Sequence, residues 1–276
     1  MTKEELIAQI VAKRSFLCVG LDTDVRKLPP HLMDEENPML SFNKAIVDAT
    51  ASSAVAFKPN VAFYESMGSY GIKVLEETIA YIKDTYPEIL VIADGKRGDI
   101  GNTGAMYARA YFEHFRADGI TVAPYMGEDS VRPFLTYTNK WVVLLALTSN
   151  EGSKDFQMQK DADGAYLFER VIRASAEWSD ESHLMYVVGA THPEQMERIR
   201  TLAPKNFLLV PGIGAQGGDF DAIVGAGITK ECGLLVNASR SIIYADSSER
   251  FAEAAHNEAE ALRLKMERAL IAEGII

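Results

Sequence analysis

The sequence predicts an α/β protein in which all 276 residues form one (β/α)8 TIM barrel domain. Eight short apolar segments, rich in Val, Ile and Leu, recur without alternating polar residues, which is typical of parallel strands buried on both faces. Amphipathic helical patterns lie between them, so strands and helices alternate as they do in a barrel. A doubly wound open sheet is the alternative fold, but it usually has fewer strands and needs a reversal of strand order that the sequence does not show.

The predicted elements follow one another along the whole chain. The strands are expected at Ser15–Leu21, Ala54–Phe57, Leu90–Ala93, Gly119–Ala123, Trp141–Leu147, Met185–Gly189, Phe207–Val210 and Gly233–Val236. Helices are expected at the N-terminus and at Tyr70–Tyr86, Gly104–Arg116, Tyr166–Trp178, Pro193–Leu202, Phe220–Ala226 and Ser247–Ala272. Ser247 is the expected N-cap of the last helix. Two longer connections, Asp22–Asn43 and Ser149–Ala165, follow strands and are therefore expected at the C-terminal, catalytic end of the barrel.

Composition argues against several classes of function. A net charge of −11 disfavours binding to nucleic acid or to anionic membranes, and no apolar run approaches the ~20 residues that cross a bilayer. The two cysteines, Cys18 and Cys232, cannot form a disulfide framework, and no Cys/His spacing indicates a metal site. We therefore expect a cytoplasmic protein. The net charge does not exclude an anionic small substrate, because a local basic pocket can exist on an acidic protein.

Charged and polar residues gather where the predicted strands end. They are Asp22, Lys58, Asn60, Asp94, Lys96, Thr148, Ser149, Ser239 and Arg240, and the seventh strand ends at Pro211. The C-terminal strand ends form the active site of a barrel, and two lysines beside two aspartates are costly unless they pair. Residues two apart in a strand share a face, so Asp94 and Lys96 should point into one space, with Asp99 in the loop that follows. This array suits acid/base chemistry on an anionic carbon compound.

A glycine-rich stretch, Pro211–Asp219, follows the seventh predicted strand. Its glycines match G-x-G-x-x-G, which read literally is a dinucleotide fingerprint, although no second mononucleotide half is found. A phosphate loop is the favoured interpretation, because barrels often hold phosphate with the loops after strands seven and eight. Gln216 would then donate an amide hydrogen bond, and Arg240 would form a bidentate pair with the phosphate.

Together these segments resemble the orotidine 5′-phosphate decarboxylase family, in its longer bacterial branch. Asp94–Ile100 is similar to the D-x-K-x-x-D-I signature of that family, Phe57–Asn60 to its second-strand lysine segment, and Val19–Asp22 to its first-strand aspartate. Pro211–Asp219 resembles its phosphate loop, and Ser239–Ile242 resembles its phosphate arginine segment. The matches occur in family order over nearly the whole predicted barrel.

The resemblance implies a homodimeric barrel enzyme that converts orotidine 5′-monophosphate to UMP and carbon dioxide, the last step of de novo pyrimidine synthesis, with neither cofactor nor metal. It implies that Lys96 donates a proton to C6, that Asp94 lies beside the substrate carboxylate, and that Lys58 pairs with Asp94 and the ribose. The other residues that it implies are Asp22 for the ribose hydroxyls, Asp99 and Thr103 from the neighbouring subunit, Ser149 for the pyrimidine, Gln216 and Arg240 for the phosphate, and Asn60, Pro211 and Gly214 as further substrate contacts.

Some points depart from the family pattern, and alternatives follow from them. The family arginine often follows a glycine, whereas here it follows Ser239, and the pyrimidine contact is either Thr148 or Ser149, of which we favour Ser149. Related barrels, the keto-gulonate phosphate decarboxylases and hexulose phosphate synthases, carry a similar D-x-K-x-x-D array with magnesium but lack the full phosphate loop. A non-catalytic nucleotide-binding barrel is the alternative from another class, and the intact Asp94 and Lys96 array argues against it.

Overall fold

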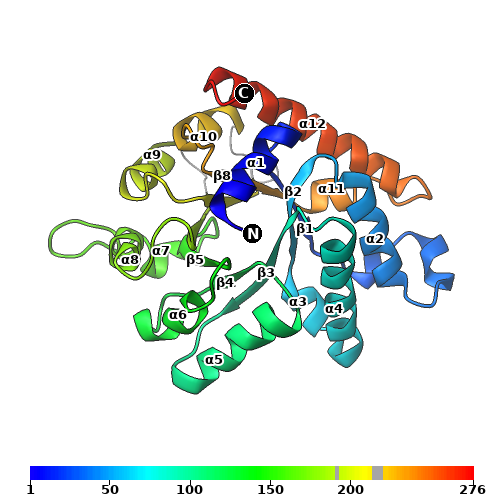
Figure 1. Ribbon diagram of the computed structural model, residues 1–276, viewed down its shortest axis with the longest axis horizontal. Helices are drawn as coiled ribbons and strands as arrows, with labels where there is room; N and C mark the ends of the chain where they lie inside the picture. The colour runs from blue at the N-terminus through cyan, green and yellow to red at the C-terminus, as the bar shows by residue number, and fades with distance from the viewer. Residues whose placement is uncertain (190–192, 213–219) are drawn as a thin grey trace.

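The computed structural model describes residues 1–189, 193–212 and 220–276. Its centre is a closed barrel of eight parallel strands in sequence order, which confirms the predicted fold (Figure 1). The strands are β1 Leu17–Leu21, β2 Ala54–Pro59, β3 Leu90–Arg97, β4 Gly119–Val122, β5 Trp141–Leu147, β6 Leu184–Val188, β7 Leu208–Pro211 and β8 Leu234–Ala238. β3 extends furthest beyond its predicted end and therefore contains Asp94 and Lys96 within the strand.

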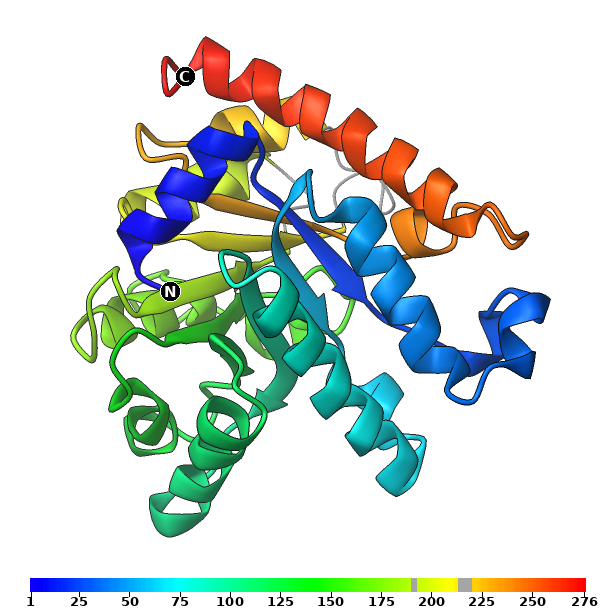
Figure 2. The same ribbon diagram turned by 45° about the vertical axis from the view of Figure 1, so that its right-hand side comes forward.

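Helices cover the outside of the barrel in all directions (Figures 1 and 2). They are α1 Lys3–Lys13, α2 Pro38–Thr50, α3 Val61–Glu65, α4 Gly68–Thr85, α5 Gly101–Arg109, α6 Glu128–Leu135, α7 Ser153–Phe156, α8 Leu167–Ala176, α9 Pro193–Leu202, α10 Phe220–Gly227, α11 Arg240–Ile243 and α12 Phe251–Ala272. Two 3-10 turns, Val25–Lys27 and Pro30–Asp34, precede α2, and a π-helical turn, Ala110–His114, continues α5.

The strands form a core that is buried on both sides, as their unbroken apolar sequences predict. Every residue of β1, β2, β4, β6 and β8 is buried. The largest side chains that are fully buried include Trp141, Phe57 and Phe207, and burial of such a side chain stabilises the fold by about 1.5–3 kcal/mol. This packing gives the strand ends a rigid frame on which to hold functional groups.

The helix α1 lies across the N-terminal end of the barrel (Figure 1). Thr2 caps its first turn, and its Leu6 and Ile10 are fully buried. The indole N–H of Trp141, at the start of β5, donates a hydrogen bond to the Met1 carbonyl at 3.0 Å. The C-terminal strand ends, where the predicted site residues lie, are therefore at the opposite end from α1.

The predicted start of the last helix is wrong. That helix begins at Phe251, and Ser247 does not cap it. The preceding residues form a turn instead, in which Ser248 Oγ accepts a hydrogen bond from the Arg250 N–H at 3.2 Å. The side chain of a Ser, Thr, Asp or Asn before a helical pattern can form its hydrogen bond either as a helix cap or within a local turn. The sequence therefore did not distinguish a cap from a turn at this position.

The predicted connection Asp22–Asn43 contains the first part of a helix. α2 begins at Pro38, and Asn37 caps it by accepting a hydrogen bond from the Leu40 N–H at 3.3 Å. Proline at the first helical position is well tolerated, because its missing N–H has no partner there in any case. The prolines that suggested an irregular loop therefore include one that starts a helix.

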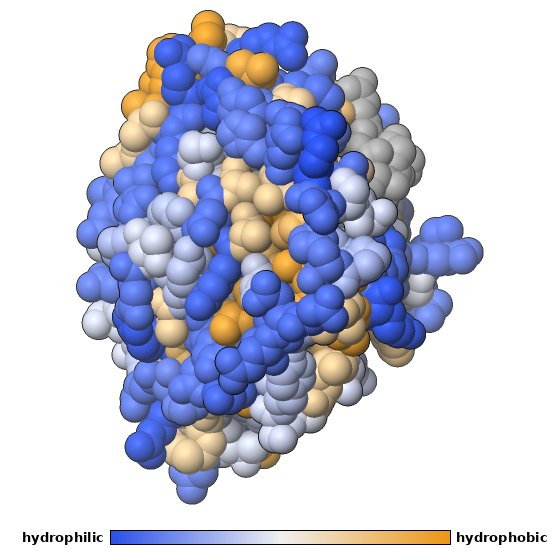
Figure 3. Space-filling model, turned by 90° about the vertical axis from the view of Figure 1, so that its right-hand side faces the viewer, coloured by the Kyte–Doolittle hydropathy of each residue, from blue (hydrophilic) through white to orange (hydrophobic). Residues whose placement is uncertain are grey.

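The surface of the molecule is largely polar on the side that carries α2. Figure 3 shows hydrophilic side chains over most of that face, with apolar side chains in a central band and in patches near the upper left and lower edges. Among the helices of the described residues, none is both long enough and apolar enough to cross a membrane.

Candidate active site

A buried carboxylate between two lysine ammonium groups forms the centre of the site. Lys58, in β2, places Nζ 2.9 Å from Asp94 Oδ2, and Lys96 places Nζ 2.6 Å from Asp94 Oδ1. Lys58 is only 5% exposed, whereas the side chain of Lys96 is 51% exposed. One ammonium group is therefore enclosed by the barrel, and the other is accessible to a ligand.

An irregularity in β3 brings Asp94 and Lys96 to the same side. Between Ala93 and Arg97, β3 advances four residues while the paired β4 advances two, so β3 is bulged at this point. Lys96 lies in the bulge with a φ of 47°, a left-handed conformation that non-glycine residues rarely adopt. The two side chains do meet, but they meet through this bulge and not through the regular alternation that the sequence suggested. Bulges often re-aim side chains beside active sites.

Thr121 completes this group, and the sequence interpretation did not single it out. Its Oγ1 donates a hydrogen bond to Asp94 Oδ1 at 2.9 Å and accepts one from the Lys96 N–H, also at 2.9 Å. Thr121 is the one polar side chain of β4 and is 1% exposed. That isolated hydroxyl in an apolar strand was the signal that could have identified it.

The charges of the centre keep one another ionised. Burial alone would raise the pKa of Asp94, but the ammonium groups of Lys58 and Lys96 outweigh it and hold this pKa well below its usual range. Burial alone would lower the pKa of Lys58, but the charges of Asp94 and Asp22 outweigh it, so that this pKa is raised. In the described part of the chain, no group of three His, Cys, Asp or Glu side chains could hold a metal ion.

Asp22 follows β1 and lies close to the same cluster. Its Oδ1 is buried and has no hydrogen-bond partner among the described residues. Its backbone is fixed by Tyr244, whose hydroxyl donates to the Asp22 carbonyl at 3.2 Å and accepts from the Asp24 N–H at 2.7 Å. A buried carboxylate oxygen without a partner is suited to accept a hydrogen bond from a ligand hydroxyl.

Two further predicted binding residues stand at the ends of β2 and β5. Asn60 Oδ1 accepts a hydrogen bond from the Ala62 N–H at 3.3 Å and so caps α3. The Thr148 hydroxyl accepts a hydrogen bond from Gln157 Nε2 at 2.9 Å. The Ser149 hydroxyl forms no hydrogen bond with a described residue. Of the two candidates for the pyrimidine contact, Ser149 therefore has the hydroxyl that is available to a ligand.

Asp99 and Thr103 form no hydrogen bond or ion pair with Lys58 or Lys96 of their own chain. Asp99 Oδ1 accepts a hydrogen bond from the Ile100 N–H at 2.8 Å, and its carboxylate forms no ion pair with a described residue. Thr103 is exposed on α5. The structure of one chain thus brings Asp22, Lys58, Asp94 and Lys96 together but does not add Asp99 to them.

The predicted phosphate site falls partly outside the described residues, because Gly214 and Gln216 are not among them. Pro211 is the last residue of β7 and pairs in register with Asn237 of β8. Arg240 begins α11 immediately after β8, and its side chain is exposed. Pro211 and Arg240 therefore follow neighbouring strands at the end of the barrel that also holds the lysines.

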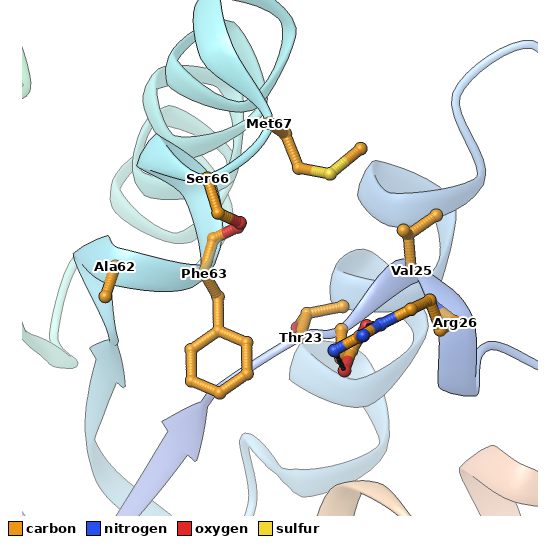
Figure 4. Close-up of a pocket in the computed structure, with 8 residues that line it drawn as sticks. Thr23, Val25, Arg26, Ala62, Phe63, Ser66 and Met67 are labelled. Carbon is orange, nitrogen blue, oxygen red and sulfur yellow. Dashed lines mark hydrogen bonds and ion pairs between the residues drawn. The ribbon is translucent and has the colours of Figure 1, made fainter.

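A hollow of about 470 Å³ lies between the turn after β1 and the helix α3 (Figure 4). It is lined by Thr23, Asp24, Val25, Arg26, Ala62, Phe63, Ser66 and Met67. Phe63 contributes to one wall, and Arg26, which pairs with Asp24 at 2.8 Å, contributes to the other. The lining residues come shortly after Asp22 and Asn60 in the chain, so the hollow adjoins the site. None of the predicted site residues lines the hollow itself.

Comparison with known proteins identifies the family of this chain. The Orotidine 5′-phosphate decarboxylase / HUMPS family model matches residues 15–255. The chain is 62% identical over 276 residues to a Porphyromonas gingivalis protein named orotidine 5′-phosphate decarboxylase, with 100% of both chains covered. It resembles the solved structure of Leishmania donovani OMP decarboxylase with a TM-score of 0.79 and 37% identity, over 96% of this chain and 99% of that one. The Leishmania donovani UMP synthase gives a TM-score of 0.80 and 39% identity over 94% of this chain, which spans 56% of that longer chain. The chain therefore belongs to the orotidine 5′-phosphate decarboxylase / HUMPS family.

Proposed function

We propose that Lys96 is the acid that protonates C6 when this enzyme decarboxylates orotidine 5′-monophosphate. The reaction releases carbon dioxide and yields UMP, in pyrimidine biosynthesis. The family match and the 62% identity to a protein of that name support the reaction. The observation that carries the role of Lys96 is its contact with Asp94, which holds the ammonium group 2.6 Å from a buried carboxylate at the barrel mouth.

The proposed chemistry uses Lys96 twice. Loss of carbon dioxide leaves an electron pair on C6 with little delocalisation into the ring, so a nearby cation must stabilise it. The attraction between the Lys96 ammonium and C6 grows as negative charge builds on that carbon, which is stabilisation specific to the transition state. The same ammonium then transfers a proton to C6, which gives UMP. The half-exposed amine that remains takes a proton from solvent.

Asp94 holds the Lys96 ammonium in position, and Lys58 supports Asp94 in that role. Asp94 would meet the substrate carboxylate, and two charges ~4 Å apart at an effective dielectric constant near 20 interact by ~4 kcal/mol. The two lysines offset part of that repulsion, so we assign it a contributory role. The larger role of Asp94 is to aim Lys96, and the enclosed Lys58 keeps the Asp94 carboxylate ionised while its ammonium group faces the ribose.

Binding groups for the rest of the nucleotide surround this centre. Asp22 would accept hydrogen bonds from the ribose hydroxyls through its buried Oδ1, which has no partner among the described residues, and Ser149 would contact the pyrimidine. Arg240 and Gln216 would hold the phosphate, although Gln216 lies outside the described residues. Phosphate binding is remote from C6, but its energy can still lower the barrier by ordering the site around the substrate.

We also propose that the enzyme is a homodimer in which Asp99 and Thr103 reach into the partner's site. Asp99 forms no ion pair with the residues of its own chain that the structure describes, and Thr103 is exposed on α5. Large apolar side chains are exposed nearby, on α5 and in the segments that follow β3 and β4, as expected of a surface that a second copy covers. They are Ile100, Met106, Tyr107, Tyr125 and Met126, of which Tyr125 is 86% exposed. A cytoplasmic location is proposed as well, since both cysteines are buried free thiols.

The experiment is a spectrophotometric assay of orotidine 5′-monophosphate loss, with and without EDTA, on wild type, Lys96→Met and Lys73→Met. Wild type should be active in EDTA, and Lys96→Met should lose at least about a thousandfold in kcat, because charge stabilisation and proton transfer are both removed. Lys96→Met should still bind UMP. The exposed Lys73 is a matched control, and its variant should behave as wild type.

Three results would contradict the proposal. Wild type that leaves the nucleotide unchanged would overturn the activity. Wild type that works only with an added divalent ion would favour the sugar-phosphate decarboxylase and aldolase branch of the same barrels. Lys96→Met activity within about tenfold of wild type would overturn the role of Lys96, because loss of the acid alone is expected to exceed that.

A further inference from the structure

We propose that Thr121 is a positioning residue for the decarboxylation, acting through Asp94 and Lys96. Its hydroxyl joins the Asp94 carboxylate to the Lys96 backbone, as described above. The proposal rests on the proposed roles of those two residues. It adds a third group whose only function in the reaction is to set their geometry.

The bulge in β3 creates the need for such a group. Where β3 advances four residues and β4 advances two, the two strands cannot continue their regular backbone pairing. The Lys96 N–H, which lies inside this interval, donates to the Thr121 side chain. The hydroxyl thus joins β4 to the bulged part of β3 at the residue that carries the proposed acid.

The direction of each hydrogen bond follows from the donors available. The Lys96 N–H can only donate, so Thr121 Oγ1 is the acceptor of that bond. The hydroxyl proton is therefore free to point at Asp94 Oδ1, which lies 2.9 Å away and which also accepts from Lys96 Nζ at 2.6 Å. A donor to Asp94 favours its ionised form. Both the backbone and the ammonium end of Lys96 are tied to the same pair of side chains, and the three residues form a closed ring of hydrogen bonds.

This ring restrains a residue that has little other restraint. The Lys96 side chain is 51% exposed, and its backbone has the left-handed φ of 47° that L-residues disfavour. Thr121 is 1% exposed and belongs to a strand that is buried throughout, so its own position is fixed. Loss of the hydroxyl leaves the Lys96 backbone free to relax toward ordinary φ values. A displacement of about 1 Å in a reacting group can lower the rate by about a hundredfold.

The test compares Thr121→Val, which keeps the shape without the hydroxyl, with Thr121→Ser, which keeps the hydroxyl. Thr121→Val should lower kcat by about 10- to 100-fold, the range expected for loss of a hydrogen bond to a charged group. Its KM should stay within about threefold of wild type, because Thr121 does not hold the ribose or the phosphate. Thr121→Ser should keep kcat within about threefold of wild type, since the hydrogen-bonding atoms remain.

Thr50→Val is the matched control. Thr50 is also fully buried and its hydroxyl donates a hydrogen bond to the Ile46 carbonyl at 2.7 Å, but it lies in α2 away from the site. It should lose thermal stability and keep kcat. Comparing Thr50→Val with Thr121→Val separates the general effect of losing a buried hydroxyl from the specific effect of losing the Thr121 hydroxyl.

Several outcomes would overturn the inference. One is a Thr121→Val kcat within threefold of wild type, and another is a Thr121→Ser loss as large as that of the valine variant, which would assign the effect to packing. If Thr121→Val does not fold, Thr121→Ala replaces it under the same criteria. An inactive wild type would overturn the proposed function and this inference with it, whereas an active wild type beside an unaffected Thr121→Val overturns the inference alone.

Discussion

Ser239 lies directly against Gly20 where β8 meets β1. Its Oγ donates a hydrogen bond to the Gly20 carbonyl at 3.2 Å. A Cβ at position 20 would lie 2.7 Å from Ser239 Cβ, closer than real atoms approach. Only glycine therefore fits at this point of barrel closure, and Arg240, the proposed phosphate ligand, is the next residue after Ser239.

Gly20→Ala should raise KM for orotidine 5′-monophosphate more than it lowers kcat. The new methyl group pushes Ser239 outward, and Arg240 moves with it, so the phosphate loses alignment with its ligand. We expect a KM increase of roughly tenfold and a stability loss of about 1–3 kcal/mol from overpacking. Steady-state kinetics and thermal unfolding measure the two effects.

The control for that variant is Gly225→Ala. Gly225 lies in α10, and a Cβ there has open space around it. This substitution should leave KM unchanged and leave stability the same or slightly higher. A Gly20→Ala enzyme with wild-type KM would show that the β1–β8 junction does not govern phosphate binding.

Lys58→Met should destabilise the fold as well as abolish activity. It leaves the buried Asp94 carboxylate without the ammonium partner at Oδ2, and breaking a buried ion pair costs about 3–5 kcal/mol. We expect a loss near the lower end, because Lys96 and Thr121 still bond to Oδ1. The double variant Lys58→Met, Asp94→Asn should recover part of the stability in chemical denaturation. Equal stability of the single and double variants would contradict the pairing.

The Asp94 carboxylate should also appear in the pH dependence of stability. Its pKa is lower in the folded protein than the ordinary value of 3.8, so its ionised form stabilises the folded state above about pH 3.8. This contribution is lost as pH falls further through the folded-state pKa. Between about pH 5 and pH 3, the free energy of unfolding of wild type should therefore fall more steeply than that of Asp94→Asn.

Denaturant titrations at several pH values test this difference. Asp34→Asn serves as the control, because Asp34 is exposed, and it should follow the wild-type curve. Parallel curves for wild type and Asp94→Asn would show that the lysine pair does not hold this carboxylate ionised.

Subunit mixing tests the proposed sharing of sites. Lys96→Ala and Asp99→Ala homodimers should each be inactive, because each lacks one residue in both sites. After mixing and exchange, roughly a quarter of wild-type activity should return, since about half of the random dimers are heterodimers with one intact site. No recovery, with exchange confirmed by mass, would place Asp99 in the site of its own chain.

The fold could be predicted because its physical determinants are local. A strand buried on both faces must be apolar throughout, and Trp141–Leu147 is so uniform that both of its predicted ends match β5. The central charges could be predicted for a related reason. Asp22, Lys58 and Asp94 follow the apolar runs of β1, β2 and β3, and parallel strands of a barrel point the same way, so that these residues come together at one end of the barrel.

What the sequence did not reveal depends on register between segments distant in the chain. Thr121 contacts Asp94 only because β3 is bulged against β4. No local sequence pattern predicts this shift in the register of the two strands. Tyr244 holds the backbone beside Asp22 across more than two hundred residues. The start of α2, capped by Asn37, was missed, and Ser247 was wrongly expected to cap α12, because polar side chains before a helical pattern also form hydrogen bonds within local turns.

Because of the bulge in β3, the number of residues in the Asp94–Asp99 segment is constrained as closely as their identities. Removing Gly95, the one residue between Asp94 and Lys96, would leave β3 advancing three residues against two in β4. Since successive residues of a strand point to opposite faces, this change would turn the Lys96 side chain away from Asp94. Side chains at the intervening positions can vary without that consequence. Insertions and deletions are therefore excluded from this segment by geometry, even where substitutions are tolerated.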